Sequence, residues 1–184
     1  MKTRLDLFDP RLGLIRGRSK PIEFLWYLSK CLIFLTPLPW PTFLKVFILR
    51  LFGAKIGRGL IIKPRVNIHF PWKLVVGDNV WIGEEVFILN FEQVSILSNA
   101  CISQRAFLCA GSHDFRDVTF RYRNSPVTIG SGAWIGACVF VCPGVNVGSE
   151  SVATVGSVVT RSVPSNAIVS GNPATVRSLR WPVF

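Results

Sequence analysis

The chain has 184 residues, of which 49% are hydrophobic and 17% are charged, so it is long enough to bury a core and too apolar to be disordered. Its net charge of +11 lies in residues 1 to 73, which carry 14 Lys and Arg against 3 Asp and Glu, whereas residues 74 to 184 carry 7 of each kind. The N-terminal end is therefore expected either to meet an anionic partner, such as a phospholipid surface or a pyrophosphate-linked substrate, or to be a solvated basic face. Nucleic acid is not expected, because no aromatic-basic binding motif accompanies the charge.

Residues 1 to 21 are polar, basic and rich in turn-forming residues, which predicts an extended arm. Residues 21 to 52 are dominated by aromatic and aliphatic side chains, and three prolines interrupt their longest uncharged run, the 14 residues from 31 to 44. A spanning helix needs about 20 apolar residues, so we predict two short helices instead, at about 22 to 35 and 42 to 52. Residues 1 to 55 would form a basic arm and a hydrophobic helical cap, which covers the open end of the next element or lies in a membrane interface.

From Ile56 onward, a bulky aliphatic residue recurs every six positions, and 14 of 15 such positions hold Ile, Leu or Val. The fifth position of most sixes is small or β-branched, as at Ala100, Ala133 and Ser157. A helix would repeat every three or four residues and an ordinary strand every two, so neither explains this pattern. A β-solenoid does explain it, with one short strand and one corner per six residues and three sixes per coil. We predict an all-β parallel β-helix of about five coils over residues 56 to 170, followed by a C-terminal tail at 171 to 184.

The six-residue pattern stops between residues 114 and 126, where a polar loop should leave the solenoid directly after His113. Histidine is the side chain best suited to act as a general base near neutral pH, whereas His69 lies at an aromatic corner and is expected to be structural. The five cysteines form no C-x-x-C pair, and no secretory leader is recognisable, which indicates a reduced cytoplasmic protein. Such a protein would be peripheral to the inner membrane if its basic end binds lipid.

Three motifs carry a resemblance to a known family: residues 132 to 136 (GAWIG), 143 to 145 (PGV) and 171 to 174 (GNPA). With the six-residue pattern, they resemble the left-handed β-helix acyltransferases that include galactoside, maltose and serine acetyltransferases. Residues 101 to 104 (CISQ) and 109 to 114 (CAGSHD), with the basic N-terminus, are most similar to colanic-acid-type polysaccharide O-acetyltransferases. The resemblance implies a left-handed winding, acetyl-CoA as the co-substrate, a homotrimer with sites between subunits, and a sugar or lipid-linked oligosaccharide as the acceptor.

The same resemblance assigns roles to individual residues. His113 would be the general base, and the N–H of Ala137 would stabilise the oxyanion. The acceptor would meet Asn90, Glu92 and Asp114, although Asp114 could instead orient the imidazole and Glu92 could instead be a solvated corner. The pantetheine arm and phosphates of the donor would meet Trp134, Ala137, Val155, Thr160, Arg161, Arg177 and Arg180, where the last two could instead be part of an exposed tail.

Other functions of a β-helix fit the sequence less well. The zinc-dependent carbonic anhydrase of this fold needs three histidines, and this chain has two, so no metal is expected. A surface-binding β-helix would carry flat arrays of Thr and no loop. The alternative that stays open is an acetyltransferase-derived module that has lost activity and whose basic N-terminus binds a membrane surface.

Overall fold

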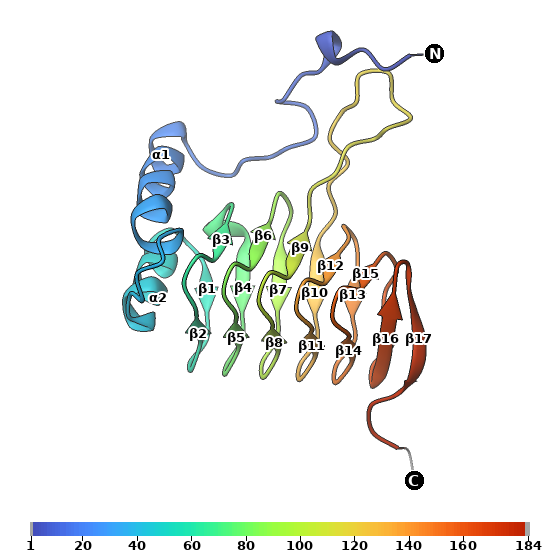
Figure 1. Cartoon of the computed structure of the whole chain (residues 1–184). Coiled ribbons are helices and arrows are strands. Elements are labelled where there is room, and N and C mark those ends of the chain that lie inside the picture. Colours follow the sequence, from blue (N-terminus) through green and yellow to red (C-terminus); the bar gives the residue numbers. More distant parts are fainter. Residues whose placement is uncertain (1, 183–184) are drawn as a thin grey trace.

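The computed structural model describes residues 2 to 182, and most of them form a parallel β-helix with three sheets as its faces (Figure 1). From β1 to β16, each strand pairs in parallel with the strand one coil away, and as far as β15 every third strand belongs to the same face. The first face holds β1 (Lys55–Ile56), β4 (Leu74–Val76), β7 (Val94–Ile96), β10 (Val127–Ile129) and β13 (Asn146–Val147). The second holds β2 (Ile61–Ile62), β5 (Trp81–Ile82), β8 (Cys101–Ile102), β11 (Trp134–Ile135), β14 (Val152–Ala153), β16 (Ala167–Gly171) and β17 (Ala174–Leu179). The third holds β3 (Asn67–Ile68), β6 (Phe87–Leu89), β9 (Phe107–Cys109), β12 (Phe140–Val141) and β15 (Val158–Val159).

The aliphatic positions of the six-residue pattern fill the interior, as predicted. Ile82, Ile102 and Ile135 occupy the same register on successive strands of the second face, and all three are fully buried. Successive coils also share main-chain hydrogen bonds, such as Gly83 N–H to the Ile102 carbonyl at 2.8 Å. Stacking thus removes apolar surface from water and satisfies the backbone at the same time, which explains why the coils need one another.

The corners between faces demand unusual backbone geometry. Several of them place a residue at positive φ, including Asn79, Asn99 and Gly132. At Gly132, where φ is +67°, an added Cβ would lie 2.0 Å from a carboxylate oxygen of Glu150 in the next coil. Glycine adopts this conformation without strain, while Asn79 and Asn99 occupy the equivalent corners of earlier coils at positive φ.

The solenoid has five complete coils and an incomplete sixth turn, one more than the predicted count of about five. Val163 bridges to Val147 on the first face, and β16 adds a strand to the second. The chain then reverses, and β17 pairs antiparallel with β16. Most of the segment predicted as a C-terminal tail is therefore strand. In β16, buried residues alternate with partly buried ones, and Val169 keeps the interior register of Ala153.

Two helices close the other end of the solenoid. They are α1 (Lys20–Ser29), which continues into the π-helical turn η2 (Lys30–Phe34), and α2 (Thr42–Leu51). Trp26, Phe34 and Leu49 join the solenoid core, and the Trp26 indole N–H donates to the His69 carbonyl at 2.9 Å. The ammonium of Lys45 is buried and donates to the Lys63 carbonyl at 3.0 Å. The helices thus cap the apolar interior and satisfy main-chain oxygens of the first coil.

The N-terminal arm, residues 2 to 19, extends away from α1 and contains one short 3-10 turn, η1 (Leu5–Leu7). A second 3-10 turn, η3 (Pro71–Lys73), marks the corner insertion of the first coil. Figure 1 shows the arm passing above the coils to the loop between β9 and β10. Within the described residues, no helix has the length and apolarity needed to cross a bilayer.

Candidate active site

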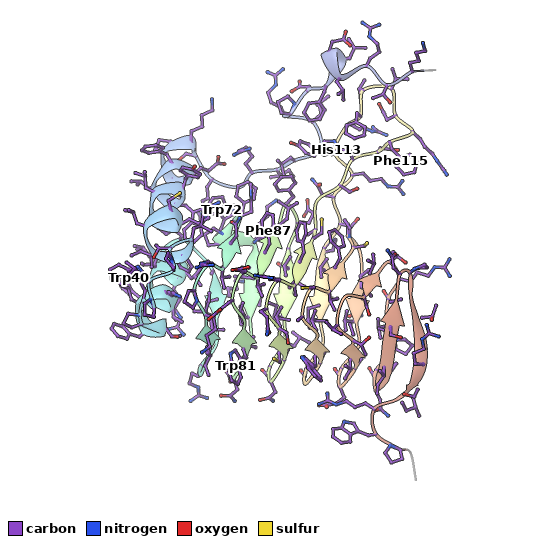
Figure 2. The ribbon with its side chains drawn as sticks, viewed as in Figure 1. Trp40, Trp72, Trp81, Phe87, His113 and Phe115 are labelled. Atoms are coloured by element: carbon purple, nitrogen blue, oxygen red, sulfur yellow. The ribbon has the colours of Figure 1, made fainter. Side chains whose placement is uncertain are left out.

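The loop that leaves the solenoid between β9 and β10 covers residues 110 to 126, so it starts four residues earlier than predicted. Its two limbs pair as a short antiparallel hairpin, with a bridge between His113 and Tyr122. The Arg123 N–H donates to the Ser112 carbonyl and the Asp114 N–H to the Arg121 carbonyl, each at 2.8 Å. These bonds make the loop a defined hairpin that carries His113 clear of the coils (Figure 2).

The imidazole of His113 is held in one tautomer. Its Nδ1 lies 2.7 Å from the carbonyl oxygen of Phe120, which can only accept, so Nδ1 carries the proton and donates it. Among the described residues, Nε2 has no hydrogen-bond partner. The ring stacks on Phe120, with centroids 4.4 Å apart and planes 7° apart, and Tyr122 and Phe8 lie against it at 4.6 and 5.5 Å. A half-buried imidazole whose Nε2 meets no hydrogen-bond partner among the described residues has the arrangement that a general base requires.

Asp114 does not touch the imidazole nitrogen that needs orienting. A carboxylate oxygen of Asp114 accepts from the Arg116 N–H at 3.1 Å and stabilises the turn of the hairpin instead. The idea that Asp114 orients the base is therefore corrected, because the Phe120 carbonyl does so. A role for Asp114 in holding the acceptor stays a prediction.

Asn90 also has another role in this chain. It is fully buried, and its amide both accepts from the Phe70 N–H at 2.8 Å and donates to the Phe70 carbonyl at 2.5 Å. This pair of bonds fixes two successive corners to each other and leaves no group free for an acceptor. Glu92, two residues further on, is partly exposed near Lys73, so it remains available to a ligand.

Three of the predicted donor residues come together. Trp134, Ala137 and Val155 line one cavity of about 360 Å³ at the corner that follows the second face. A second cavity of about 390 Å³ adjoins it, lined by Trp81 among others, and the two share Ser103 and Gln104. They form a continuous groove along the solenoid, which we call the donor groove. Its length and partly apolar lining suit an extended chain such as a pantetheine arm.

Sequence reasoning missed Ser103 and Gln104 as groove residues. The Trp134 indole N–H donates to the Ser103 hydroxyl at 2.9 Å, which fixes the ring on the groove wall. The signal was present in the six-residue pattern, since Trp81, Cys101 and Trp134 share one register on the second face. A row of exposed tryptophans at one register position marks a wall that faces outward.

The remaining predicted donor residues lie outside the donor groove. Thr160 and Arg161 are exposed on the corner after β15. The guanidinium of Arg180 donates to the Gly132 carbonyl at 2.8 Å and ties the end of the chain to the fourth coil. Arg177 donates to the Ser170 hydroxyl at 2.9 Å on the antiparallel strand pair and is otherwise exposed. Contacts of these four residues with CoA phosphates stay predictions.

Cys109, the cysteine nearest His113 in the sequence, is unsuited to act as a nucleophile. Cys109 is buried, and its thiol lies 3.1 Å from the Gly111 carbonyl as a donor. Burial raises the pKa of this thiol above its usual value, which lowers the fraction of reactive thiolate. All five cysteines are free, and no group of three or more potential metal ligands occurs in residues 2 to 182.

The two halves of the site do not meet within one chain. His113 projects on the hairpin from one side of the prism, while Trp81, a wall residue of the donor groove, lies on the opposite side (Figure 2). Trp134 stands in the same row as Trp81, two coils further along. His113 and this groove could therefore belong to one site only if a second copy of the chain brought them together.

Comparisons with known proteins agree with this architecture, although no family model matches the chain. A protein of Escherichia coli (strain K12) that carries the name colanic acid biosynthesis acetyltransferase WcaF is 40% identical over 175 residues, 94% of this chain and 94% of the relative. A solved galactoside acetyltransferase in complex with coenzyme A matches with a TM-score of 0.77 and 23% identity, covering 89% of this chain and 84% of that one. A hexapeptide-repeat acetyltransferase of Vibrio cholerae O1 biovar eltor, VCA0836, complexed with acetyl coenzyme A, matches with a TM-score of 0.78 and 21% identity, covering 89% of each chain.

The six-residue pattern, the stacked prism and these likenesses define one class of enzyme. The chain belongs to the hexapeptide-repeat acetyltransferase family. Within the family it is similar over nearly its whole length to the colanic acid acetyltransferase of E. coli. The predicted fold and family are thereby confirmed, and the left-handed winding follows from the membership.

Proposed function

We propose that the protein is an O-acetyltransferase that moves the acetyl group of acetyl-CoA directly to a sugar hydroxyl, with His113 as the general base. The observation that carries this proposal is the hydrogen bond from His113 Nδ1 to the Phe120 carbonyl, which leaves the Nε2 lone pair free. A neutral imidazole at this position can take a proton without any change of tautomer or of ring orientation.

The reaction needs no covalent intermediate on the protein. Nε2 of His113 takes the hydroxyl proton as the sugar oxygen attacks the thioester carbonyl, which gives a tetrahedral oxyanion. The N–H of Ala137 donates no hydrogen bond among the described residues, so it is free to stabilise that oxyanion. When the tetrahedral species collapses, the C–S bond breaks, and the imidazolium returns its proton to the departing CoA thiolate. The buried thiol of Cys109 takes no part.

Assembly as a homotrimer would complete the site. Each His113 hairpin would reach the donor groove of the adjoining subunit, and a threefold ring of such contacts gives three equivalent sites. The acceptor would then lie between the hairpin and the neighbouring coils, where Asp114 and Glu92 offer polar side chains. The name of the E. coli relative favours a sugar of an exopolysaccharide or O-antigen precursor as the acceptor.

The helical cap supports a lipid-linked acceptor, met at the cytoplasmic face of the inner membrane. The outer surface of α1, η2 and α2 exposes large apolar side chains that the solenoid does not cover: Phe24, Leu25, Leu28, Leu32, Phe43, Phe47 and Leu51. We call this surface the apolar cap face. Basic residues such as Arg18 and Lys20 flank it on the same segment of the chain, as expected for a surface that lies in the headgroup region of an anionic bilayer.

The direct test is transfer of labelled acetyl from acetyl-CoA to candidate precursors, read by mass spectrometry, for the parent and for His113→Ala. We expect kcat to fall at least about a hundredfold, because general-base catalysis contributes that much, while the KM for acetyl-CoA changes little. His69→Gln, which removes the other histidine, is the control and should transfer normally. A smaller loss for His113→Ala would exclude it as the base.

The second candidate function is membrane binding by a chain that has lost acetyl transfer. The apolar cap face is the observation that favours it. Parent protein that binds anionic vesicles yet transfers no acetyl to any precursor, with or without the vesicles, would support this candidate over the first.

A further inference from the structure

A row of aromatic rings connects the proposed base with the helical cap. The His113 and Tyr122 centroids are 4.6 Å apart, those of Tyr122 and Phe91 5.7 Å, and those of Phe91 and Phe70 6.0 Å. Trp72 continues the row, stacked on Phe70 at 5.0 Å. These rings come from the hairpin and from the corner insertions of the first two coils, so the row crosses the solenoid from coil to coil.

The N-terminal arm lies along this row. At one end Phe8 packs on His113 and Tyr122, with centroids 5.5 and 5.3 Å away. At the other end the Arg16 guanidinium lies 5.5 Å from the Phe70 ring centroid, and the Trp72 indole N–H donates to the Arg16 carbonyl at 2.6 Å. Leu14, between these ends, is 6% exposed. The arm therefore packs on the rings instead of extending into solvent.

Two hydrogen bonds and one glycine fix the register of the arm on the hairpin. The Arg4 N–H donates to the Val118 carbonyl at 2.8 Å, and the Asn124 side-chain amide donates to the Gly13 carbonyl at 3.0 Å. Gly13 has a φ of +81°, and a Cβ there would lie 2.8 Å from the Tyr122 carbonyl oxygen. The close approach of arm and hairpin thus depends on glycine at this position.

We propose that residues 4 to 18 are part of the active site, a strap that fixes the His113 hairpin, and that Phe8 is a positioning residue for the imidazole. This inference rests on the proposed function. The hairpin lies in a 17-residue loop and meets the second coil where the Tyr122 ring packs on Phe91. The strap adds contacts between the hairpin and the rest of the chain, and Phe8 packs against the His113 ring itself. Displacing a general base by about 1 Å lowers the rate about a hundredfold. Holding the imidazole in place therefore offsets the conformational entropy that the arm loses when it is ordered.

The first test is Phe8→Ala in the full chain. We expect kcat to fall about tenfold to a hundredfold while the KM for acetyl-CoA stays within about twofold, because no residue of the strap lines the donor groove. Phe8→Tyr, which keeps the ring, should restore most of the rate. Leu38→Ala is the control, since Leu38 lies outside the strap, is 56% exposed and should leave both constants unchanged.

Amide hydrogen exchange separates this inference from the proposed function. If the strap holds the hairpin, the amides of Asp114 and Arg123, which close it, should exchange at least about tenfold faster in Phe8→Ala, whether or not His113 is the base. Gly13→Val, which displaces the arm without touching the imidazole, should give the same exchange and the same loss of kcat. Unchanged exchange and unchanged kcat in both variants would overturn the proposal. A rise in the KM for acetyl-CoA alone would do so as well, because the arm would then serve the donor.

Discussion

The two histidines of the chain show how far a residue's surroundings decide its chemistry. Both lie among aromatic rings, yet the His113 ring keeps one nitrogen unpaired on a projecting hairpin, whereas the His69 ring packs between Phe70 and Phe91 at 4.4 and 4.9 Å. Burial, together with the nearby charges of Lys30 and Arg16, lowers the pKa of His69 to about 4. His69 is therefore a packing residue that stays neutral near pH 7.

This difference predicts a pH dependence of stability. The His69 imidazole has a pKa near 6.5 in the unfolded chain and about 4 in the folded one, so between these values the unfolded state binds more protons. The contribution of His69 is then full above pH 6.5 and is lost as the pH falls toward 4. Between pH 7 and 5, we expect the parent to lose on the order of 2 kcal/mol of unfolding free energy, measured by denaturant titration. His69→Gln should lose much less over that range, and an equal loss would contradict the assignment.

At the residue scale, the sequence indicated which histidine is the candidate base but not which groups hold its ring in place. The place of His113, directly before the break in the six-residue pattern, was enough to single it out. The Phe120 carbonyl and the Phe8 ring left no trace in the pattern, because the hairpin contact is set by a turn and the arm contact joins residues more than a hundred positions apart. Asn90 misled for a related reason, since a polar residue in an apolar repeat can satisfy a neighbouring corner as well as a ligand.

The elements of the solenoid could be predicted almost completely, because their periodicity is local and is repeated in every coil. The elements at the two ends could not. Strand β17 follows a reversal of the chain and does not continue the six-residue pattern. The arm has the composition of an extended polar segment, and its sequence does not show which surface it packs on. The helices were predicted from composition, but composition does not say which of their faces meets the first coil. In the structure Trp26 and Leu49 face the core.

The apolar cap face, which does not pack on the solenoid core, gives a prediction at the scale of the helices. Phe43 and Phe47 of α2 are 76% and 63% exposed on the apolar cap face. If this face lies in a bilayer interface, the double variant Phe43→Glu with Phe47→Glu should bind vesicles of phosphatidylglycerol and phosphatidylcholine at least about tenfold more weakly, since each ring removed from lipid costs about 1.5 to 3 kcal/mol. Sedimentation measures the binding. Val176→Glu, at the other end of the solenoid, is the matched control, and equal binding by all three proteins would remove the membrane role.

At the scale of the whole molecule, a regular prism has identical corners, so a site arises only where the repeat is broken. The hairpin breaks it after β9, and the donor groove follows the corner after the second face in coils two to five. The sequence predicted both features but not that they occupy different sides of the prism. They are separated because the hairpin leaves the solenoid after β9 of the third face, whereas the groove follows the strands of the second face.

A site built from two chains makes a prediction that a site contained in one chain cannot satisfy. His113→Ala removes the base but keeps the donor groove, whereas Val155→Trp should block the groove, whose cavity Val155 lines, and keep the base. Each variant alone should be inactive. If the chains are unfolded together and refolded as mixed trimers, about a quarter of the sites should pair an intact base with an intact groove, so about a quarter of the parent activity should return. Light scattering confirms the oligomer, and mixing the folded variants without unfolding is the control. If each chain held a complete site, no mixture would recover activity, because every chain would still carry one defect.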